Sequence, residues 1–254
     1  MSSLSVCVIC CDEEAELPRC LDSVAFADEL VVVVDAKSTD RSEAIARSRA
    51  DRVEVRPYDG DIEQKSYCTS LATGDWVLVI DPDEVMRPEL ATTLRAAVDA
   101  DNPGLGGYEL DRLTWYLGRW IRHGDFYPDW TLRLFRRRGH RWSGLNPHGR
   151  IEVDGVVERL RGELEHYSYR DLGDHLDRAQ RWSSQAAAAL YADGRRTHLW
   201  DLAIRPLWRF ARGYLLKRGF LDGMPGFAIA SVNAFYVFLK YAKLWELGRK
   251  APRE

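Results

Sequence analysis

Apolar runs punctuate the first hundred residues at regular intervals. Each is short and bounded by turn residues, which predicts strands, and the second is apolar almost throughout, which predicts burial on both faces of a sheet. The four runs are "LSVCVICC" (4–11), "DELVVVVD" (28–35), "DRVEVRP" (51–57) and "DWVLVID" (75–81).

Stretches of mixed polarity with helix-forming residues follow each run. They predict helices at about 15–23, 41–50, 62–72 and 88–98. Pro18 and Pro88 suit first turns, and Ser38, Thr39 and Asp40 offer N-cap side chains for the second helix. Strand and helix in alternation predict an α/β fold with a parallel, doubly wound sheet.

The remaining chain has a different pattern. Residues 102–169 are rich in Trp, Arg, Gly and Tyr with short strand-like pieces, and we expect a β-containing extension that covers the carboxyl edge of the sheet. Residues 170–194 predict a helix. From Ile204 apolar residues recur at helical spacing, with Pro206 in the first turn, and a run of about sixteen apolar residues follows, shorter than the ~20 that span a bilayer.

Charge divides the chain in two. Residues from Arg195 onward hold 12 Lys and Arg against 4 Asp and Glu, so the preceding part holds 24 against 35. Basic flanks beside Trp, Tyr and aliphatic residues favour a helical element that lies on anionic lipid. A helix pair docked on the rest of the protein, or buried in a dimer, is the alternative. Nucleic-acid binding is disfavoured because bulky aliphatics alternate with the basic residues.

The five cysteines all lie in the first third of the chain. Cys7 and Cys10 have the CxxC spacing of a zinc site, but no second pair follows, so buried reduced thiols in a cytoplasmic protein are favoured. The N-terminus has neither the positive region nor the cleavage site of a secretory signal.

Carboxylates follow three of the predicted strands, at Asp12, Asp35 and Asp81. Parallel sheets bind ligands at the carboxyl ends of their strands, so these residues predict a site. The first turn, "CDEEAE", has no glycine, which excludes a G-x-G-x-x-G or P-loop cradle for phosphate. The D-x-D of "DPDE", Asp81 and Asp83, instead fits Mg²⁺ or Mn²⁺ completed by substrate phosphates, with Glu84 bracing the loop.

These motifs resemble glycosyltransferase family 2, through "SVCVICCDEE", "VVVVDAKSTDRS", "EQKSY" and "GDWVLVIDPDE". The later "LGRWIRHGDFYPDWTLRLFRR" and "LEHYSYRD" resemble its lipopolysaccharide-core β-glycosyltransferase branch, so the similarity covers nearly the whole chain. The resemblance implies a GT-A fold with a mostly parallel Rossmann-like sheet, and an inverting, metal-dependent transfer from a nucleotide-diphospho-sugar, with UDP favoured. The acceptor would be a lipid-linked or lipopolysaccharide-core glycan at the inner face of the cytoplasmic membrane.

The resemblance also implies roles for individual residues. Asp35 matches the nucleobase ligand, Asp81 lies near the ribose and the metal, and Asp83 ligates the metal. His166 is a further metal ligand in this comparison, with His148 an alternative. The residues that match the first nucleotide-binding loop and a donor-side lysine are Asp12, Glu14 and Lys65.

The catalytic base is sought in "HGDFYPDW". Asp129 is favoured over Asp125 because "YPD" matches the branch, and the alternative is that Asp129 only caps a turn. Arg133 and Arg136 alternate along a predicted strand and face either the diphosphate or solvent.

Three departures from the family pattern stand out. Cys10-Cys11-Asp12 replaces Thr-Tyr-Asn, which removes an aromatic residue near the base. Lys37 replaces a glycine in a turn, and Gly149 replaces a Glu that normally follows the branch histidine.

We expect a catalytic domain at 1–194, with a nucleotide-binding half (1–100) and an acceptor-side extension (101–194), followed by a basic, amphipathic, membrane-associating region at 195–254. One rival is a sugar-phosphate nucleotidyltransferase, which would need a glycine-rich first loop. The other is a catalytically degenerate, membrane-associated scaffold that binds nucleotide-sugars.

Overall fold

The structure is a computed structural model in which residues 1–145 and 148–250 are described. The chain forms two compact units, and each is described by itself. The sheet unit comprises Met1–Arg112 and Asp129–His166, and the helical unit comprises Leu113–Pro128 and the chain from Tyr167 onward. Compactness thus groups the helix that follows Tyr167 with the C-terminal helices, whereas the sequence placed the division at 194/195.

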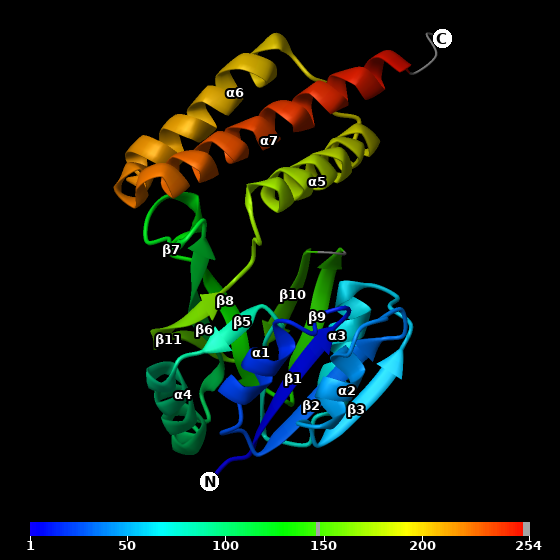
Figure 1. Cartoon of the computed structure of the whole chain (residues 1–254), viewed down its shortest axis with the longest axis vertical. Helices are drawn as coiled ribbons and strands as arrows, with labels where there is room; N and C mark the ends of the chain where they lie inside the picture. Colours follow the sequence, from blue (N-terminus) through cyan, green and yellow to red (C-terminus); the bar gives the residue numbers. More distant parts are fainter. Residues whose placement is uncertain (146–147, 251–254) are drawn as a thin grey trace. The chain divides into compact units, whose positions relative to one another are not determined.

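Parallel strands form the first half of the sheet, as predicted (Figure 1). Their order is β3-β2-β1-β4, and Val6 of β1 lies opposite Leu30 of β2 and Leu78 of β4. The strands are β1 (Leu4–Cys10), β2 (Glu29–Asp35), β3 (Arg52–Arg56) and β4 (Trp76–Val79); the helices that follow them are α1 (Leu17–Ser23), α2 (Ser42–Arg47), α3 (Asp61–Leu71) and α4 (Pro88–Ala100).

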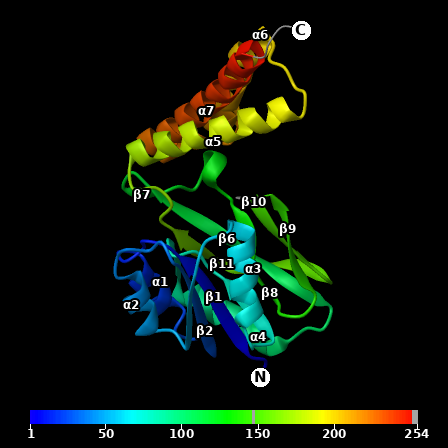
Figure 2. The ribbon, with the colours of Figure 1, turned by 90° about the vertical axis from the view of Figure 1, so that its right-hand side faces the viewer.

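Antiparallel strands from the middle of the chain extend this sheet on the side of β4. Unpaired backbone groups on β4 need a partner, and β8 supplies it, placing Leu134 opposite Leu78 and Phe135 opposite Val77. The sheet continues in the order β8-β6-β11-β5, from β8 (Trp130–Arg136), β6 (Leu105–Tyr116), β11 (Val156–His166) and β5 (Glu84–Met86). The ribbon of β9 (His140–Leu145) and β10 (His148–Val153) packs against α3 (Figure 2).

The two faces of β1 belong to different apolar clusters. Val6, Val8 and Cys10 pack on one side, whereas Cys7 packs on the other beside Cys68. Cys7 and Cys10 therefore lie on opposite faces and cannot share a zinc ion. Burial raises the pKa of Cys10 to about 12, so its thiol stays protonated.

All five cysteines are free thiols, and the favoured interpretation holds for four of them. Cys11 is the correction, because it lies past the end of β1 and is exposed. The burial expected for the whole set therefore stops where the strand stops.

The helical unit contains α5 (Leu172–Ala192), α6 (Leu199–Ala211) and α7 (Gly223–Lys250), with the two-residue β7 (Arg119–Trp120) paired to the end of β6. α7 packs against both α5 and α6 (Figure 1). Within the described ranges, no helix has both the length and the apolarity that a membrane crossing requires.

The start of α6 differs from the sequence expectation. The His198 side chain accepts from the backbone of Asp201 while the Asp201 carboxylate accepts from His198 N, and this capping box begins the helix at Leu199. Pro206 consequently lies inside the helix rather than in its first turn. A π-helical turn at Arg212–Leu216 continues it.

Candidate functional site

Two loops at the carboxyl edge of the sheet are joined through Asp12. Its Oδ1 accepts hydrogen bonds from the backbone N–H of Thr39 at 2.7 Å and of Asp40 at 3.3 Å. Asp12 has φ 54°, in the left-handed region that Asp and Asn tolerate better than other non-glycine residues. The carboxylate predicted to bind nucleotide therefore organises the loops after β1 and β2.

Glu14 and Asp35 complete this pair of loops. Glu14 accepts from Arg41 N at 3.1 Å and Arg41 Nε at 3.2 Å. Asp35 is buried and accepts from Lys37 N at 3.0 Å. Among the described non-glycine residues, positive φ occurs elsewhere but not at Lys37, so this turn does not require the glycine that the family carries there.

Asp81 is held between two cations. Its Oδ1 lies 3.0 Å from Lys65 Nζ, and its Oδ2 lies 2.6 Å from an Arg133 nitrogen. Burial would raise the pKa of Asp81, but Arg133 and Lys65 outweigh it and hold that pKa well below its usual range. Burial likewise opposes the charge of Lys65, and Asp81 and Asp61 reverse this, so the pKa of Lys65 is raised. Both groups are thus charged near neutral pH.

A chain of ion pairs continues from Asp81 to the predicted base. Arg133 binds both Asp81 and the fully buried Glu84. Arg112 Nη1 lies 3.5 Å from Glu84, and its Nη2 lies 2.7 Å from Asp129 Oδ2. Arg112 therefore holds the Asp129 side chain in place at this edge of the sheet.

Three side chains named in the sequence analysis have structural partners that differ from one another. Glu84 Oε2 accepts from Asp81 N at 3.0 Å, which confirms that Glu84 braces the loop. Arg133 is buried, so the expectation of a solvent-facing arginine is wrong for this residue. Arg136 stacks on Trp76 at 4.5 Å and pairs with Asp101 at 2.9 Å, which gives it a structural role.

Asp83 and His166 form the remaining acidic part of the site. Their Oδ2 and Nε2 atoms are 3.5 Å apart, because β11 pairs with β5 and places His166 opposite Glu84. His166 Nδ1 is buried without a hydrogen-bond partner. Within the part of the chain that the structure describes, no three His, Cys, Asp or Glu side chains gather closely enough to hold a metal by themselves.

This donor set fits a divalent cation that takes its other ligands from a substrate. Mg²⁺ is commonly bound by one or two carboxylates together with phosphates and water. The connected ion pairs hold one more carboxylate than cations, and Asp83 adds a second excess negative charge, which one divalent ion would balance. The members are Asp61, Asp81, Glu84 and Asp129 with Lys65, Arg112 and Arg133.

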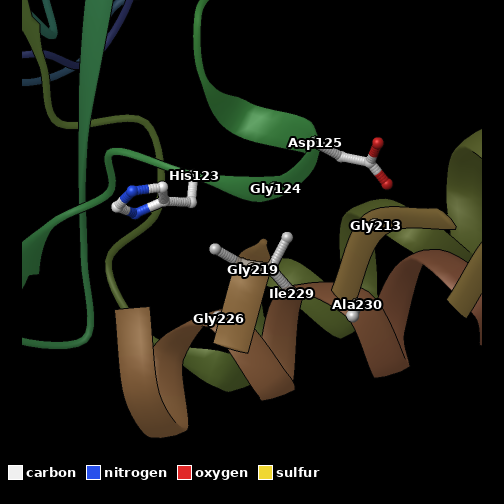
Figure 3. A pocket seen from close by; sticks show the side chains of 8 residues that line it. All are labelled: His123, Gly124, Asp125, Gly213, Gly219, Gly226, Ile229 and Ala230. Atoms are coloured by element: carbon white, nitrogen blue, oxygen red, sulfur yellow. The ribbon is translucent and has the colours of Figure 1, made fainter. Parts of the chain in front are cut away.

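Asp125, the alternative base, lies in the helical unit and is enclosed. Its side chain is 3% exposed and lies within 3.4 Å of Arg209, Arg212 and Lys217. Gly213 packs so closely that a Cβ there would lie 2.7 Å from Asp125 Oδ2 (Figure 3). This packing makes Asp125 the centre of a buried ionic cluster and disfavours it as an acceptor-side base.

Sequence reasoning missed Arg112 and the buried role of Arg133. Their signal is an arginine inside an apolar strand pattern, in "YELDRLTWY" and "TLRLFRR". Charged residues are almost never fully buried without a partner, so such a position predicts a buried acid opposite it.

The model of glycosyl transferase family 2 matches residues 5–158. This is more than half of the chain, and with the acidic edge of the α/β sheet it identifies the class of protein: the chain belongs to glycosyltransferase family 2 and is a glycosyltransferase. The expected GT-A fold class is confirmed. Membership favours sugar transfer over the nucleotidyltransferase alternative.

The chain is also similar to individual proteins, some of whose descriptions are more specific than that of the family. A protein of Rickettsia typhi described as an uncharacterized glycosyltransferase is 30% identical, covering 99% of this chain and 89% of its own. The lipopolysaccharide core biosynthesis glycosyltransferase LpsC of Rhizobium meliloti is 28% identical, covering 96% and 92%. Among solved structures, glucosyl-3-phosphoglycerate synthase from Mycobacterium tuberculosis with Mg²⁺ and uridine-diphosphate has a TM-score of 0.36 and 24% identity, over 46% of this chain and 44% of that one. That partial overlap says nothing about ligands of this chain.

Proposed function

We propose that this protein is a metal-dependent, inverting glycosyltransferase that takes its sugar from a nucleotide-diphospho-sugar, with UDP the favoured nucleotide. The observation that carries the proposal is the acidic edge of the sheet, where Asp83 meets His166 beside the paired Asp81 and Lys65. A glycine-free first turn leaves a cation as the means of holding the donor phosphates.

The acceptor we propose is a lipid-linked or lipopolysaccharide-core glycan at the inner face of the cytoplasmic membrane. Support comes from the name and full-length similarity of the Rhizobium meliloti relative, which acts in lipopolysaccharide core biosynthesis. The relative is 28% identical, so the class of acceptor is carried over and the sugar is not.

The residues divide the chemistry among them. Asp83 and His166 would hold Mg²⁺ or Mn²⁺, which offsets the charge of the leaving diphosphate. Asp35 would bind the nucleobase, and Lys65, which pairs with Asp81, would turn toward a donor phosphate. Asp129 would take the proton from the acceptor hydroxyl as the new C–O bond forms at the anomeric carbon and the bond to the diphosphate breaks on the opposite face.

Calorimetric titration of the full chain with UDP, with and without Mn²⁺, tests this proposal. We expect metal-dependent binding that Asp83→Asn and His166→Ala each weaken about tenfold or more, since each removes one of two protein ligands. Asp177→Asn, an exposed carboxylate on α5, is the matched control and keeps wild-type affinity. UDP affinity that is equal with and without Mn²⁺, or that neither variant lowers, would refute the assigned site.

A donor panel then separates transfer from mere binding. Release of nucleotide is measured with UDP-, GDP- and ADP-sugars in the presence of a core-oligosaccharide acceptor. Turnover with one of these donors supports the transferase, whereas metal-dependent binding of nucleotide without turnover of any donor supports the scaffold.

A further inference from the structure

The apolar stripe of α6 points to solvent. Amphipathic helices of globular proteins normally turn such a stripe toward the core. Here its members are largely exposed, with Trp200 at 72% and Leu207 at 68%. The stripe, which we call the α6 apolar face, comprises Trp200, Ile204, Leu207, Trp208 and Leu215.

The polar side of the helix accounts for this inversion. α6 packs against α7, and the two helices lie side by side in Figure 1. Asp201 is buried, the Arg205 guanidinium lies 5.1 Å from the Tyr241 ring of α7, and Arg209 reaches Asp125 at 3.3 Å. Phe210 also packs against Phe227 of α7, with ring centroids 5.7 Å apart, so charged and aromatic contacts together hold this side of the helix and leave the α6 apolar face outside.

Exposed apolar side chains continue past the end of the helix. The segment that leads from α6 into the first turn of α7 carries Leu216, Phe220, Leu221 and Met224, and Met224 is 75% exposed. Clustered exposed apolar side chains favour an interaction surface, so we treat these four residues as a tip of the α6 apolar face.

The charges on this segment select the partner. Residues 195–224 contain seven Arg and Lys, and their only acids, Asp201 and Asp222, are both buried. The charge that this segment presents to solvent is therefore positive, which matches an anionic lipid surface. A second copy of the chain would set positive charge against positive charge. At about 1.5 Å per residue, the 13 residues of α6 reach only ~20 Å, less than a bilayer core of ~30 Å.

We propose that the α6 apolar face and its tip dock in the plane of an anionic phospholipid bilayer. The Trp, Leu, Ile and Phe side chains enter the boundary between headgroups and acyl chains, and exposed residues such as Arg195, Arg196 and Arg218 contact lipid phosphates. This deepens the proposed function, on which it rests, because it names the surface that brings the enzyme to a lipid-linked acceptor.

Vesicle sedimentation of the full chain tests the proposal. We expect the protein to sediment with vesicles of equal phosphatidylcholine and phosphatidylglycerol, and far less with phosphatidylcholine alone. Leu207→Ser with Trp208→Ser should lower the bound fraction on the order of tenfold, since it removes two exposed apolar side chains that would enter the bilayer. Arg195→Glu with Arg218→Glu should remove the preference for the anionic vesicle.

Matched controls test whether a loss of vesicle binding is specific to the α6 apolar face. Val156→Ser with Val157→Ser removes two exposed apolar residues from β11 in the sheet unit and should leave sedimentation unchanged. Thermal unfolding of every variant confirms that it is folded. Equal sedimentation of the α6 variant and wild type, or no binding to anionic vesicles, overturns the proposal.

Two further measurements distinguish membrane docking from a dimer interface and from a failure of the proposed transferase site. Gel filtration that shows a wild-type dimer, lost in the Leu207 and Trp208 variant without any vesicle binding, assigns the face to a second copy and overturns the membrane assignment. UDP titration of the same variants is independent of lipid. Failure of nucleotide binding with intact vesicle binding therefore rejects the proposed transferase site and not the docking surface.

Discussion

Asp81 in the sheet unit and Asp125 in the helical unit are both carboxylates held by several cations. Asp81 binds Lys65 and Arg133, and Asp125 lies among Arg209, Arg212 and Lys217. Their surroundings separate them, because the Asp81 side chain is 24% exposed beside Asp83 and the Asp125 side chain is 3% exposed against glycines.

The difference shows what distinguishes a site from a structural cluster. Cations around an acid do not by themselves indicate chemistry, since buried ion pairs also serve packing. A ligand site is indicated when the acid lies at an accessible edge and a neighbouring carboxylate has no Lys or Arg partner. Such an edge offers both space and uncompensated negative charge to a ligand. The first cluster meets this condition through Asp83, and the second does not.

The largest expected effect contrasts the two candidate bases. Asp129→Asn should leave UDP binding intact while lowering sugar transfer by roughly 10²–10⁴-fold, the usual contribution of a positioned proton acceptor. Asp125→Asn should keep transfer within about threefold of wild type at a temperature where the variant is folded. Nucleotide release in the presence of acceptor measures both, and near-normal turnover of Asp129→Asn would exclude it as the base.

The second effect is on stability, and here the substitution expected to matter is at Asp125 rather than at Asp129. Asp125→Asn leaves three cations clustered around a neutral side chain, and breaking a buried ionic cluster from one side costs about 3 kcal/mol. We expect urea unfolding to show a loss of that size. Asp177→Asn on the surface of α5 is the control, expected to change stability by less than about 0.5 kcal/mol. A loss no larger than the control's would mean that the cluster is not stabilising.

A third, smaller effect uses pH and concerns the helical unit. His175 is buried, its Nδ1 lies 2.8 Å from the Tyr116 hydroxyl, and burial with nearby Arg178 lowers the pKa of His175 to about 4, while Asp174 opposes this. The unfolded state, with a pKa near 6.5, binds the proton first, so stability falls as pH drops from about 6.5 to about 4.

The expected loss is about 2 kcal/mol between pH 7 and pH 5. Urea unfolding at both pH values should show it in wild type and not in His175→Gln, which can still accept from Tyr116. The low pKa of Asp81 gives an effect of the same sign at lower pH: its contribution is present above its ordinary pKa and is lost as pH falls below that value. Equal pH dependence in wild type and variant would reject His175 as the source.

The smallest effect tests a departure from the family pattern. Lys37 occupies a turn without positive φ, so Lys37→Gly should relieve no strain. It should instead lower stability by less than about 1 kcal/mol, through the added freedom of the unfolded chain. Thermal unfolding measures this, and a stabilised variant would show that the turn is strained.

Local patterns predicted the part of the fold that local physics decides. Apolar runs located β1 to β4, and prolines in first turns located α1 and α4. The expected N-cap of α2 at Ser38, Thr39 or Asp40 is wrong in position, because α2 begins after Arg41, which makes no side-chain cap. The carboxylates after three strands indicated the edge of the candidate site. Pairing between distant segments was not accessible in this way. The sequence does not say that β8 would pair with β4, and the arginine that neutralises Asp81 arrives on that strand.

The helical unit shows the same boundary between local and distant information. Periodicity correctly placed an apolar stripe on one side of α6, yet it cannot say which side faces the protein. The observed orientation is accompanied by contacts with residues distant in the chain, of Arg205 with Tyr241 and of Arg209 with Asp125.

One close contact links two positions of the family pattern. A Cβ at Gly149 would lie 2.7 Å from Cγ1 of Ile62, near the start of the helix that carries Lys65. A side chain at position 149 therefore requires Ile62 to shift or to become smaller. Positions 62 and 149 are thus coupled: Ile62→Ala should lower the cost in stability of any larger residue at position 149.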